Sequence, residues 1–144
     1  MRKLTLFLIL LLLGAILFVL FTWNTVYEQS IEILDPQEVS IGMNLIRSTL
    51  DNTFEFSYTV DPYTGVVTVT TWSEGLGEIF LVNQNAWPNF RDAIVGFYEP
   101  WSELIQYTTT GVSILILQYV NDANLAHVFL EVQDGEVIYD TFDN

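Results

Sequence analysis

The stretch FEFSYTVDPYTGVVTVTTW, residues 54–72, decides the fold because it contains two strand patterns around one turn. In its first half, bulky apolar side chains alternate with polar ones, which is typical of a strand that buries one face. Asp61, Pro62 and Gly65 supply what a tight turn requires, with proline at its second position and glycine where φ is positive. A second strand pattern, VVTVTTW, follows. The stretch therefore predicts a β-hairpin.

A helical pattern precedes this hairpin. Asp35 is a typical N-cap, Pro36 suits the first helical position, and Glu38 completes the start signature. The apolar residues of one helical face then follow at spacings of four, three and four: Val39, Met43, Ile46 and Leu50. A strand is the alternative, because apolar residues also alternate from Val39 to Leu45 and Gly42 weakens a helix. The start signature favours the helix.

A longer helical pattern follows the hairpin, over residues 85–107. Asn85 is a candidate cap, and Pro88 lies near the start. Pro100 removes a backbone hydrogen bond and crowds the carbonyl of Gly96, so we expect a kinked helix or two helices that meet near Glu99. The segment EIFLVN, residues 78–83, is expected to be a short strand or a lead-in. Apolar residues recur every three or four positions in the helix: Trp87, Phe90, Ile94, Phe97, Trp101 and Ile105.

The C-terminal third has strand patterns. Residues 112–120, VSILILQYV, are apolar on both alternating faces, which indicates a central strand. NDANLAH, residues 121–127, is expected to be a polar connection, and Asp134-Gly135 predicts the tight turn of a second hairpin. The expected order is thus α-β-β-α-β-β-β. We predict an α+β fold in which one antiparallel sheet carries helices on one face.

The N-terminal segment, MRKLTLFLILLLLGAILFVLFTW, resembles a membrane span. Residues 4–21 contain no charged side chain, and as a helix they would extend about 27 Å, close to the hydrocarbon core of about 30 Å. Arg2 and Lys3 precede the run, so the positive-inside rule puts the N-terminus in the cytoplasm, with Trp23 and Tyr27 as interfacial residues. A cleaved signal peptide is the first alternative, although bulky residues follow the run. A buried soluble helix is the second.

These observations predict four parts of the chain. Residues 1–3 are a cytoplasmic tail, residues 4–23 a transmembrane signal-anchor helix, residues 24–34 a spacer, and residues 35–144 an extracytoplasmic α+β domain. The expected location is the cytoplasmic membrane, in a single pass, with the C-terminal domain outside the cytoplasm. The chain has no cysteine, so neither a disulfide nor a lipid-modified N-terminal cysteine is present.

Charge restricts the classes of partner. All 18 acidic residues follow residue 23, against two basic residues, Arg47 and Arg91, so this part carries a formal charge of −16. A field of this sign repels the phosphate backbone, and nucleic-acid binding is not expected. It favours solubility, attraction of cations, or a basic partner.

Catalytic chemistry has little support in the sequence. His127 is the single histidine, no GxSxG surrounds a serine, and Glu99 with Glu103 is a pair of carboxylates that chance explains among so many. We expect no catalytic residue and no cofactor.

Non-covalent binding has a few candidate residues. Trp72, Trp87 and Trp101 are expected in the core, with an exposed binding surface as the alternative. For a hard cation such as Ca²⁺, the oxygen-bearing candidates are Asn121, Asp122 and Asn124, or Asp140 and Asp143.

The C-terminal segment VNDANLAHVFLEVQDGEVIYD resembles the corresponding part of small bacterial secreted or membrane-anchored proteins of unknown function. The resemblance implies an extracytoplasmic location and no particular activity. Those proteins commonly look like lipoproteins, and this chain departs from them in lacking cysteine. The matching residues are Asn121, Asp122, Asn124, Asp134, Gly135, Ile138, Tyr139 and Asp140.

Together these features lead to one expected function. We expect a membrane-anchored extracytoplasmic domain that acts as a non-catalytic protein-interaction or envelope-associated module. Its expected partners are the lipid bilayer, through residues 4–23, and a basic envelope protein or a subunit of a membrane complex. The alternative is an extracytoplasmic domain that binds a small ligand or Ca²⁺.

Overall fold

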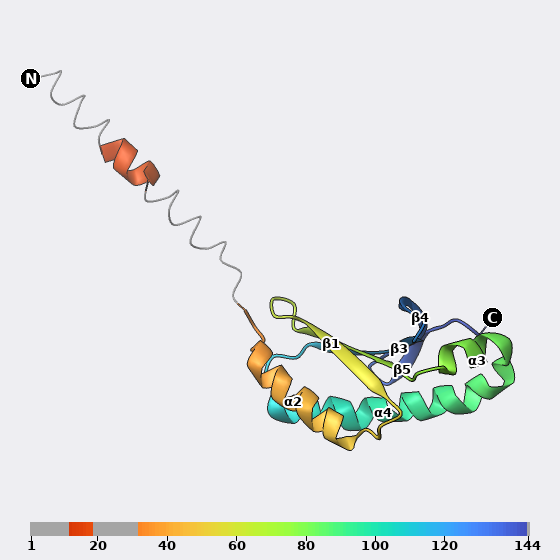
Figure 1. Cartoon of the computed structure of the whole chain (residues 1–144). Coiled ribbons are helices and arrows are strands. Elements are labelled where there is room, and N and C mark those ends of the chain that lie inside the picture. The colour runs from red at the N-terminus through yellow and green to blue at the C-terminus, as the bar shows by residue number, and fades with distance from the viewer. Residues whose placement is uncertain (1–11, 19–31, 144) are drawn as a thin grey trace, which may run out of the picture. The chain divides into compact units, whose positions relative to one another are not determined.

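The computed structural model describes residues 12–18 and 32–143. The chain divides into two compact units, Met1–Ile31 and Glu32–Asn144, and the second contains the whole sheet (Figure 1). Its elements, in chain order, are α2 (Pro36–Thr49), β1 (Glu55–Asp61), β2 (Val66–Trp72), α3 (Leu76–Val82), the 3-10 helix η1 (Gln84–Ala86), α4 (Trp87–Thr108), β3 (Ile114–Asn121), β4 (Asn124–Gln133) and β5 (Glu136–Asp140).

The predicted transmembrane signal-anchor helix over residues 4–23 is not supported by the described part of the chain. Within that segment the structure describes residues 12–18, which are helical. A helix must be about 30 Å long to cross the hydrocarbon core, and no helix among residues 12–18 and 32–143 is long and apolar enough. The prediction is therefore corrected. Its remaining residues, including Arg2, Lys3, Trp23 and Tyr27, lie outside the described part of the chain.

The sheet is mixed, and the prediction of an antiparallel sheet is wrong. Its strands lie in the order β1-β2-β3-β4-β5. β2 and β3 are parallel, with Val66 opposite Ile114 and Thr71 opposite Tyr119, whereas the other three pairs are antiparallel. The cause is the connection: α4 carries the chain back from the end of β2, so that β3 starts in the direction of β2. The fold is α+β with a mixed sheet.

The predicted order α-β-β-α-β-β-β also omits two elements, α3 and η1. Residues 78–83, expected to be a strand or a lead-in, lie largely in α3, because Phe80 is buried against Trp87 and Tyr119 on one side of a helical turn.

α4 is one helix of 22 residues that includes Pro100, so the alternative of two helices is wrong. Gly96 is exposed, which lets water satisfy the carbonyl that Pro100 leaves without a donor.

Several local predictions are confirmed. The Asp35 carboxylate caps α2 by accepting a hydrogen bond of 2.8 Å from the Gln37 N–H. The Asp61 carboxylate accepts hydrogen bonds from two amides of the β1–β2 turn. Asp134 and Gly135 have φ values of 52° and 78°, the positive pair that a two-residue hairpin turn requires. Short-range signals thus predicted the cap and both hairpins.

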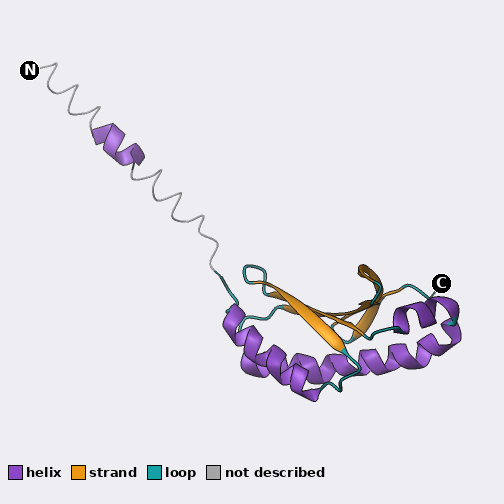
Figure 2. Ribbon diagram, in the orientation of Figure 1, coloured by secondary structure: helices purple, strands orange, loops and turns teal. Residues whose placement is uncertain are grey.

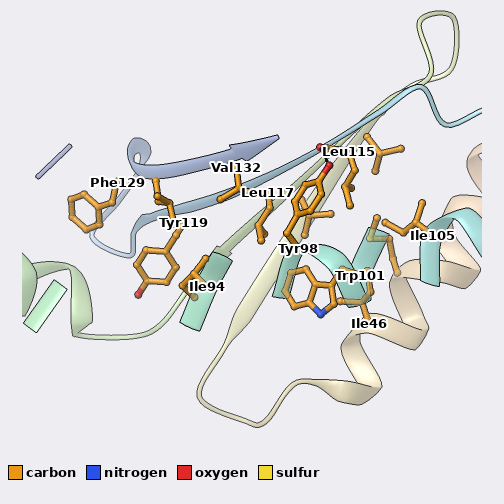
Figure 3. Close-up of a cluster of buried hydrophobic side chains, with 14 of the residues drawn as sticks. Ile46, Ile94, Tyr98, Trp101, Ile105, Leu115, Leu117, Tyr119, Phe129 and Val132 are labelled. Atoms are coloured by element: carbon orange, nitrogen blue, oxygen red, sulfur yellow. Dashed lines mark hydrogen bonds between the residues drawn. The ribbon is translucent and has the colours of Figure 1, made fainter. Parts of the chain in front are cut away.

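The core lies between the helices and one face of the sheet. α2 and α4 contact each other on that face, and Figure 2 shows both below the strands. Trp87 and Trp101 are 2% and 3% exposed, which confirms them as core residues, whereas Trp72 is half-buried on the opposite face. Figure 3 shows how side chains of the two helices meet those of β3 and β4, among them Ile46, Ile94, Trp101, Ile105, Leu117 and Val132.

Candidate functional site

Two of the predicted cation ligands stabilise the fold instead. The two carboxylate oxygens of Asp122, at the β3–β4 turn, accept hydrogen bonds from the backbone N–H groups of Gly75 (2.7 Å) and Gly77 (3.0 Å). These N–H groups belong to the start of α3, so Asp122 caps that helix from across the fold. The bond from Gly75 is the main reason why the pKa of Asp122 lies below its usual range. Asn121 accepts from the Ala123 N–H within the same turn.

The other predicted ligands lie apart from that turn. Asp140 is buried at the end of β5 and pairs with Arg91 at 3.3 Å, while the exposed Asp143 lies 3.7 Å from the same guanidinium. Asn124 accepts a hydrogen bond from a nearby backbone amide. Among residues 12–18 and 32–143, no three His, Cys, Asp or Glu side chains lie close enough to hold a metal ion. The structure thus places the first set, Asn121, Asp122 and Asn124, in turns and a helix cap, and brings the second, Asp140 and Asp143, together at Arg91.

His127 lies inside β4, not at the end of a polar connection over residues 121–127 as predicted, because β4 begins at Asn124. Its ring packs edge-on against Phe129, with centroids 4.9 Å apart. In the described part of the chain it makes no hydrogen bond with a hydroxyl or a carboxylate. This geometry is that of a packed strand residue.

Three buried hydroxyls form a second polar feature, within the core. Thr71, Ser73 and Tyr119 have no hydrogen-bond partner for their hydroxyl oxygens among the described residues. Burial raises the pKa of Tyr119 to about 12. The Tyr119 ring packs against Phe80 and Phe90, and none of the three residues lines the surface cleft described next. They belong to the packing of the core.

The surface carries an acidic cleft of about 420 Å³. It lies between the C-terminal half of α4, the start of β3 and the β4–β5 turn. Its carboxylates are Glu99 and Glu103, four residues apart on one face of α4, and Asp134 in the turn. No arginine or lysine lines it. We call this feature the acidic cleft.

Tyr98 fixes the three walls of the acidic cleft to one another. Its hydroxyl donates to the Leu115 carbonyl of β3 at 3.0 Å and accepts from the Asp134 N–H at 2.8 Å. Figure 3 shows the ring of Tyr98 reaching from α4 toward Leu115. Burial, the largest cause, raises the pKa of Tyr98 above its ordinary value. The carboxylates are therefore displayed on a rigid frame.

The carboxylates of the acidic cleft have no cationic partner in the described part of the chain. Glu99, Glu103 and Asp134 are exposed, and their carboxylates take part in none of the hydrogen bonds or ion pairs found there. The two arginines of residues 32–143 are occupied elsewhere: Arg47 lies over the ring of Phe56 at 5.4 Å, and Arg91 pairs with Asp140. A complement to the cleft has to come from another molecule.

A second acidic cleft, of about 480 Å³, lies at the start of α2 and differs in this respect. There Asp35 caps α2, and Glu38 accepts a hydrogen bond of 3.3 Å from the Thr110 N–H. Two of its three carboxylates thus serve the fold, and Glu32 is the third. The acidic cleft beside Tyr98 is the better candidate.

The sequence named Glu99 and Glu103 as a pair but predicted no cleft there, and it assigned Asp134 to a turn alone. The missing step was the packing of three elements around one place. Residues 109–113 join α4 to β3, so the C-terminal half of α4 lies beside the start of β3. Because β4 runs antiparallel to β3, with Ile116 opposite Gln133, its end brings Asp134 to the same place. The short link between the predicted helix and the predicted strand was the signal that could have indicated part of this arrangement.

Comparison with known proteins adds no functional information. No family model, no curated protein and no solved structure matches the chain. The resemblance of residues 120–140 to small bacterial secreted proteins therefore stays a prediction. The function has to be argued from the geometry alone.

Proposed function

We propose that residues 32–143 form a non-catalytic protein-interaction domain whose acidic cleft binds a basic segment of another protein. The observation that supports this proposal most strongly is the set of three carboxylates, Glu99, Glu103 and Asp134, around one cleft without a basic residue. Like charges four apart on a helix, such as Glu99 and Glu103, destabilise it by a few tenths of a kcal/mol. A basic partner would relieve this repulsion.

The size and chemistry of the acidic cleft support a polypeptide ligand over a single ion. Its three carboxylates do not converge closely enough for a metal ion, as no such cluster occurs among the described residues. The cleft also offers the hydroxyls and amide of Ser102, Ser113 and Gln106, which can hydrogen-bond to a peptide backbone. Several separated charges match several lysine or arginine side chains.

The chemistry of the described residues gives catalysis no comparable support. The single histidine packs against Phe129, and the cleft holds carboxylates, amides and hydroxyls without a nucleophile beside a base. Binding of a basic partner requires only a stable frame and unpaired negative charge, and the cleft has both.

The proposal is tested by titrating the full chain with a flexible basic peptide, Lys-Arg-Gly-Ser-Lys-Arg-Gly-Ser-Lys. The cleft variant combines Glu99→Gln, Glu103→Gln and Asp134→Asn; the last change keeps the turn, because Asn-Gly suits it as well as Asp-Gly. The control variant removes the same charge from exposed positions elsewhere, with Glu55→Gln, Glu74→Gln and Glu78→Gln.

We expect the cleft variant to bind at least about tenfold more weakly than the wild type, and the control variant within about twofold. Binding of the wild type should weaken as salt is added, because exposed charges are screened. Equal losses in the two variants would mean that net charge alone attracts the peptide, and the proposal would fail.

A location outside the cytoplasm is the second part of the proposal. It rests on the sequence of the N-terminus, where Arg2 and Lys3 precede an uncharged apolar run, a composition that is typical of export signals. Protease added to intact cells would digest residues 32–143 if they lie outside. Digestion that requires lysis of the cells would contradict this location.

A further inference from the structure

The strand β5 forms an edge of the sheet and is unusually apolar for that position. It pairs with β4 on one side, and no described strand pairs with its other side. Three consecutive side chains are exposed on it: Val137 (42%), Ile138 (52%) and Tyr139 (48%). An edge strand presents unpaired backbone N–H and C=O groups, and exposed apolar side chains beside them favour pairing with another chain.

The opposite edge of the sheet is protected differently. In β1 the side chains alternate, and one face carries Glu55, Ser57, Thr59 and Asp61. Charged and polar residues of this kind discourage pairing at an edge. The apolar character is therefore a property of β5 and not of edge strands in this fold generally.

The β5 edge is continuous with the acidic cleft. Asp134 and Gly135 line the cleft, and Glu136, the next residue, begins β5. A polypeptide that lies along β5 thus passes directly beside the carboxylates of the cleft. The apolar edge of β5 and the acidic cleft can therefore contact the same polypeptide.

Charge decides between the two possible occupants of β5. A second copy of this chain would bring Asp134 and Glu136 of both molecules toward the same edge, and each chain has a formal net charge of −14. Like charges placed opposite each other destabilise strand pairing. A strand with apolar residues in its centre and basic residues at its ends has no such penalty, and its charges complement Asp134 and Glu136.

We propose that the partner binds as an added β-strand: an extended segment of another protein, apolar in its centre and basic at its ends, pairs with β5 while its basic end occupies the acidic cleft. This inference rests on the proposed function and names the mode of binding. In strand addition, backbone hydrogen bonds provide affinity and alternate side chains provide specificity.

The test uses two peptides of one sequence, Lys-Arg-Val-Thr-Val-Thr-Val-Arg-Lys, of which the second is N-methylated at alternate central amides. Methylation removes the donors needed for pairing and keeps every charge and side chain. The full chain is titrated with both peptides, and amide hydrogen exchange of β5 is measured with and without each. The protein variant Ile138→Ser is compared with Tyr58→Ser, which alters an exposed apolar residue on the opposite edge.

We expect the unmodified peptide to bind about tenfold more tightly than the methylated one, since two net backbone hydrogen bonds account for such a ratio. It should slow exchange in β5 and not in β1, and Ile138→Ser should weaken it several-fold while Tyr58→Ser does not.

Equal binding of the two peptides would overturn strand addition and leave the proposed function intact, because the charges would suffice. Failure of both peptides and of the flexible basic peptide would overturn both proposals. Concentration-dependent dimerisation that Ile138→Ser abolishes would show that a second copy is the occupant, which contradicts the inference.

Discussion

The indole Nε1 of Trp87 donates to both carboxylate oxygens of Asp140, at 2.9 and 3.1 Å, across 53 positions of sequence. Trp87 is 2% exposed and the Asp140 side chain 3% exposed. Arg91 and the Phe142 N–H also donate to this carboxylate. The pair fastens the end of β5 to the start of α4, and thus holds in place the strand that carries the proposed docking edge.

Asp140→Ala should lower the free energy of unfolding by about 3 kcal/mol, because it leaves the buried Trp87 Nε1 without an acceptor and Arg91 without its main partner. Urea denaturation of the variant measures this change. Asp143→Ala is the matched control, since Asp143 is 77% exposed and should contribute within about 0.5 kcal/mol. Equal losses in both variants would contradict the role given to Asp140.

Gly42 allows α2 to approach α4 closely. A Cβ at this position would lie 2.6 Å from Thr108 Oγ1 and 3.5 Å from Ile105 Cα. Gly42→Ala should therefore destabilise the wild type, although alanine favours a helix over glycine by about 1 kcal/mol. In a Thr108→Ala background the near atom is gone, and the same change should stabilise. A double-mutant cycle of unfolding free energies measures the coupling, and additive effects would refute the contact.

Loss of the hydroxyl should lower the free energy of unfolding by different amounts at two buried tyrosines, Tyr98 and Tyr119. Tyr98→Phe should cost about 1–3 kcal/mol, because it leaves the Asp134 N–H without an acceptor and removes the donor to Leu115. Tyr119→Phe should be close to neutral, because the Tyr119 hydroxyl makes no hydrogen bond of ordinary geometry among the described residues, although Ser73 lies near enough to affect its pKa. Thermal and urea denaturation of both variants test this order.

The dependence of stability on alkaline pH tests the burial of the Tyr119 hydroxyl. Its folded-state pKa of about 12 lies above the reference value of 10.0. A raised pKa means that the contribution to stability is complete below about pH 10 and is lost as the pH rises through 12. The wild type should thus lose stability more steeply than Tyr119→Phe above pH 10. Identical alkaline profiles would contradict the buried, neutral hydroxyl.

Asp122 should give the opposite dependence, at acid pH. Its pKa in the folded protein lies below the reference value of 3.8, chiefly because of the bond from the Gly75 N–H. A lowered pKa means that its contribution is present above about pH 4 and is lost as the pH falls through the folded-state pKa. Asp122→Asn keeps one acceptor oxygen and loses the other, so it should cost about 1 kcal/mol at pH 7, the usual value of one hydrogen bond, and little at pH 2.

Asp134→Asn is the control for that profile, since the Asp134 carboxylate accepts no hydrogen bond among the described residues. At pH 7 its unfolding free energy should lie within about 0.5 kcal/mol of that of the wild type. A cost for Asp122→Asn that stays constant down to pH 2 would show that its carboxylate is not the cap.

Local elements of this fold could be predicted from the sequence because their causes are local. Asp35 with Pro36 specified the start of α2, and Asp134-Gly135 specified a turn with two positive φ values, which few residue pairs adopt readily. α3 was missed because the contacts that stabilise it come from residues far away in the sequence: Phe80 packs on Tyr119, and Asp122 caps the helix from another turn. Tertiary contacts overrode the strand propensity of its residues.

The acidic cleft depended on topology, which the sequence pattern left open. Glu99, Glu103 and Asp134 are neighbours because a short connection folds β3 back along α4, and because β4 runs antiparallel to β3, with Ile116 opposite Gln133. The candidate cation ligands also took roles that depend on tertiary contacts, such as the cap that Asp122 provides for α3 and the ion pair of Asp140 with Arg91. Asn and Asp residues are as suited to turns and caps as to metal sites, and sequence alone does not distinguish these uses.

The most direct test of the central claim is to map the basic peptide Lys-Arg-Gly-Ser-Lys-Arg-Gly-Ser-Lys onto the ¹⁵N-labelled full chain by NMR chemical-shift perturbation. The account predicts that the largest shifts fall on amides around the acidic cleft, at Glu99, Glu103, Ser113 and Gly135, and that added salt reverses them. Shifts centred on the second cleft, at Glu32 and Glu38, or spread evenly over the acidic surface, would contradict it.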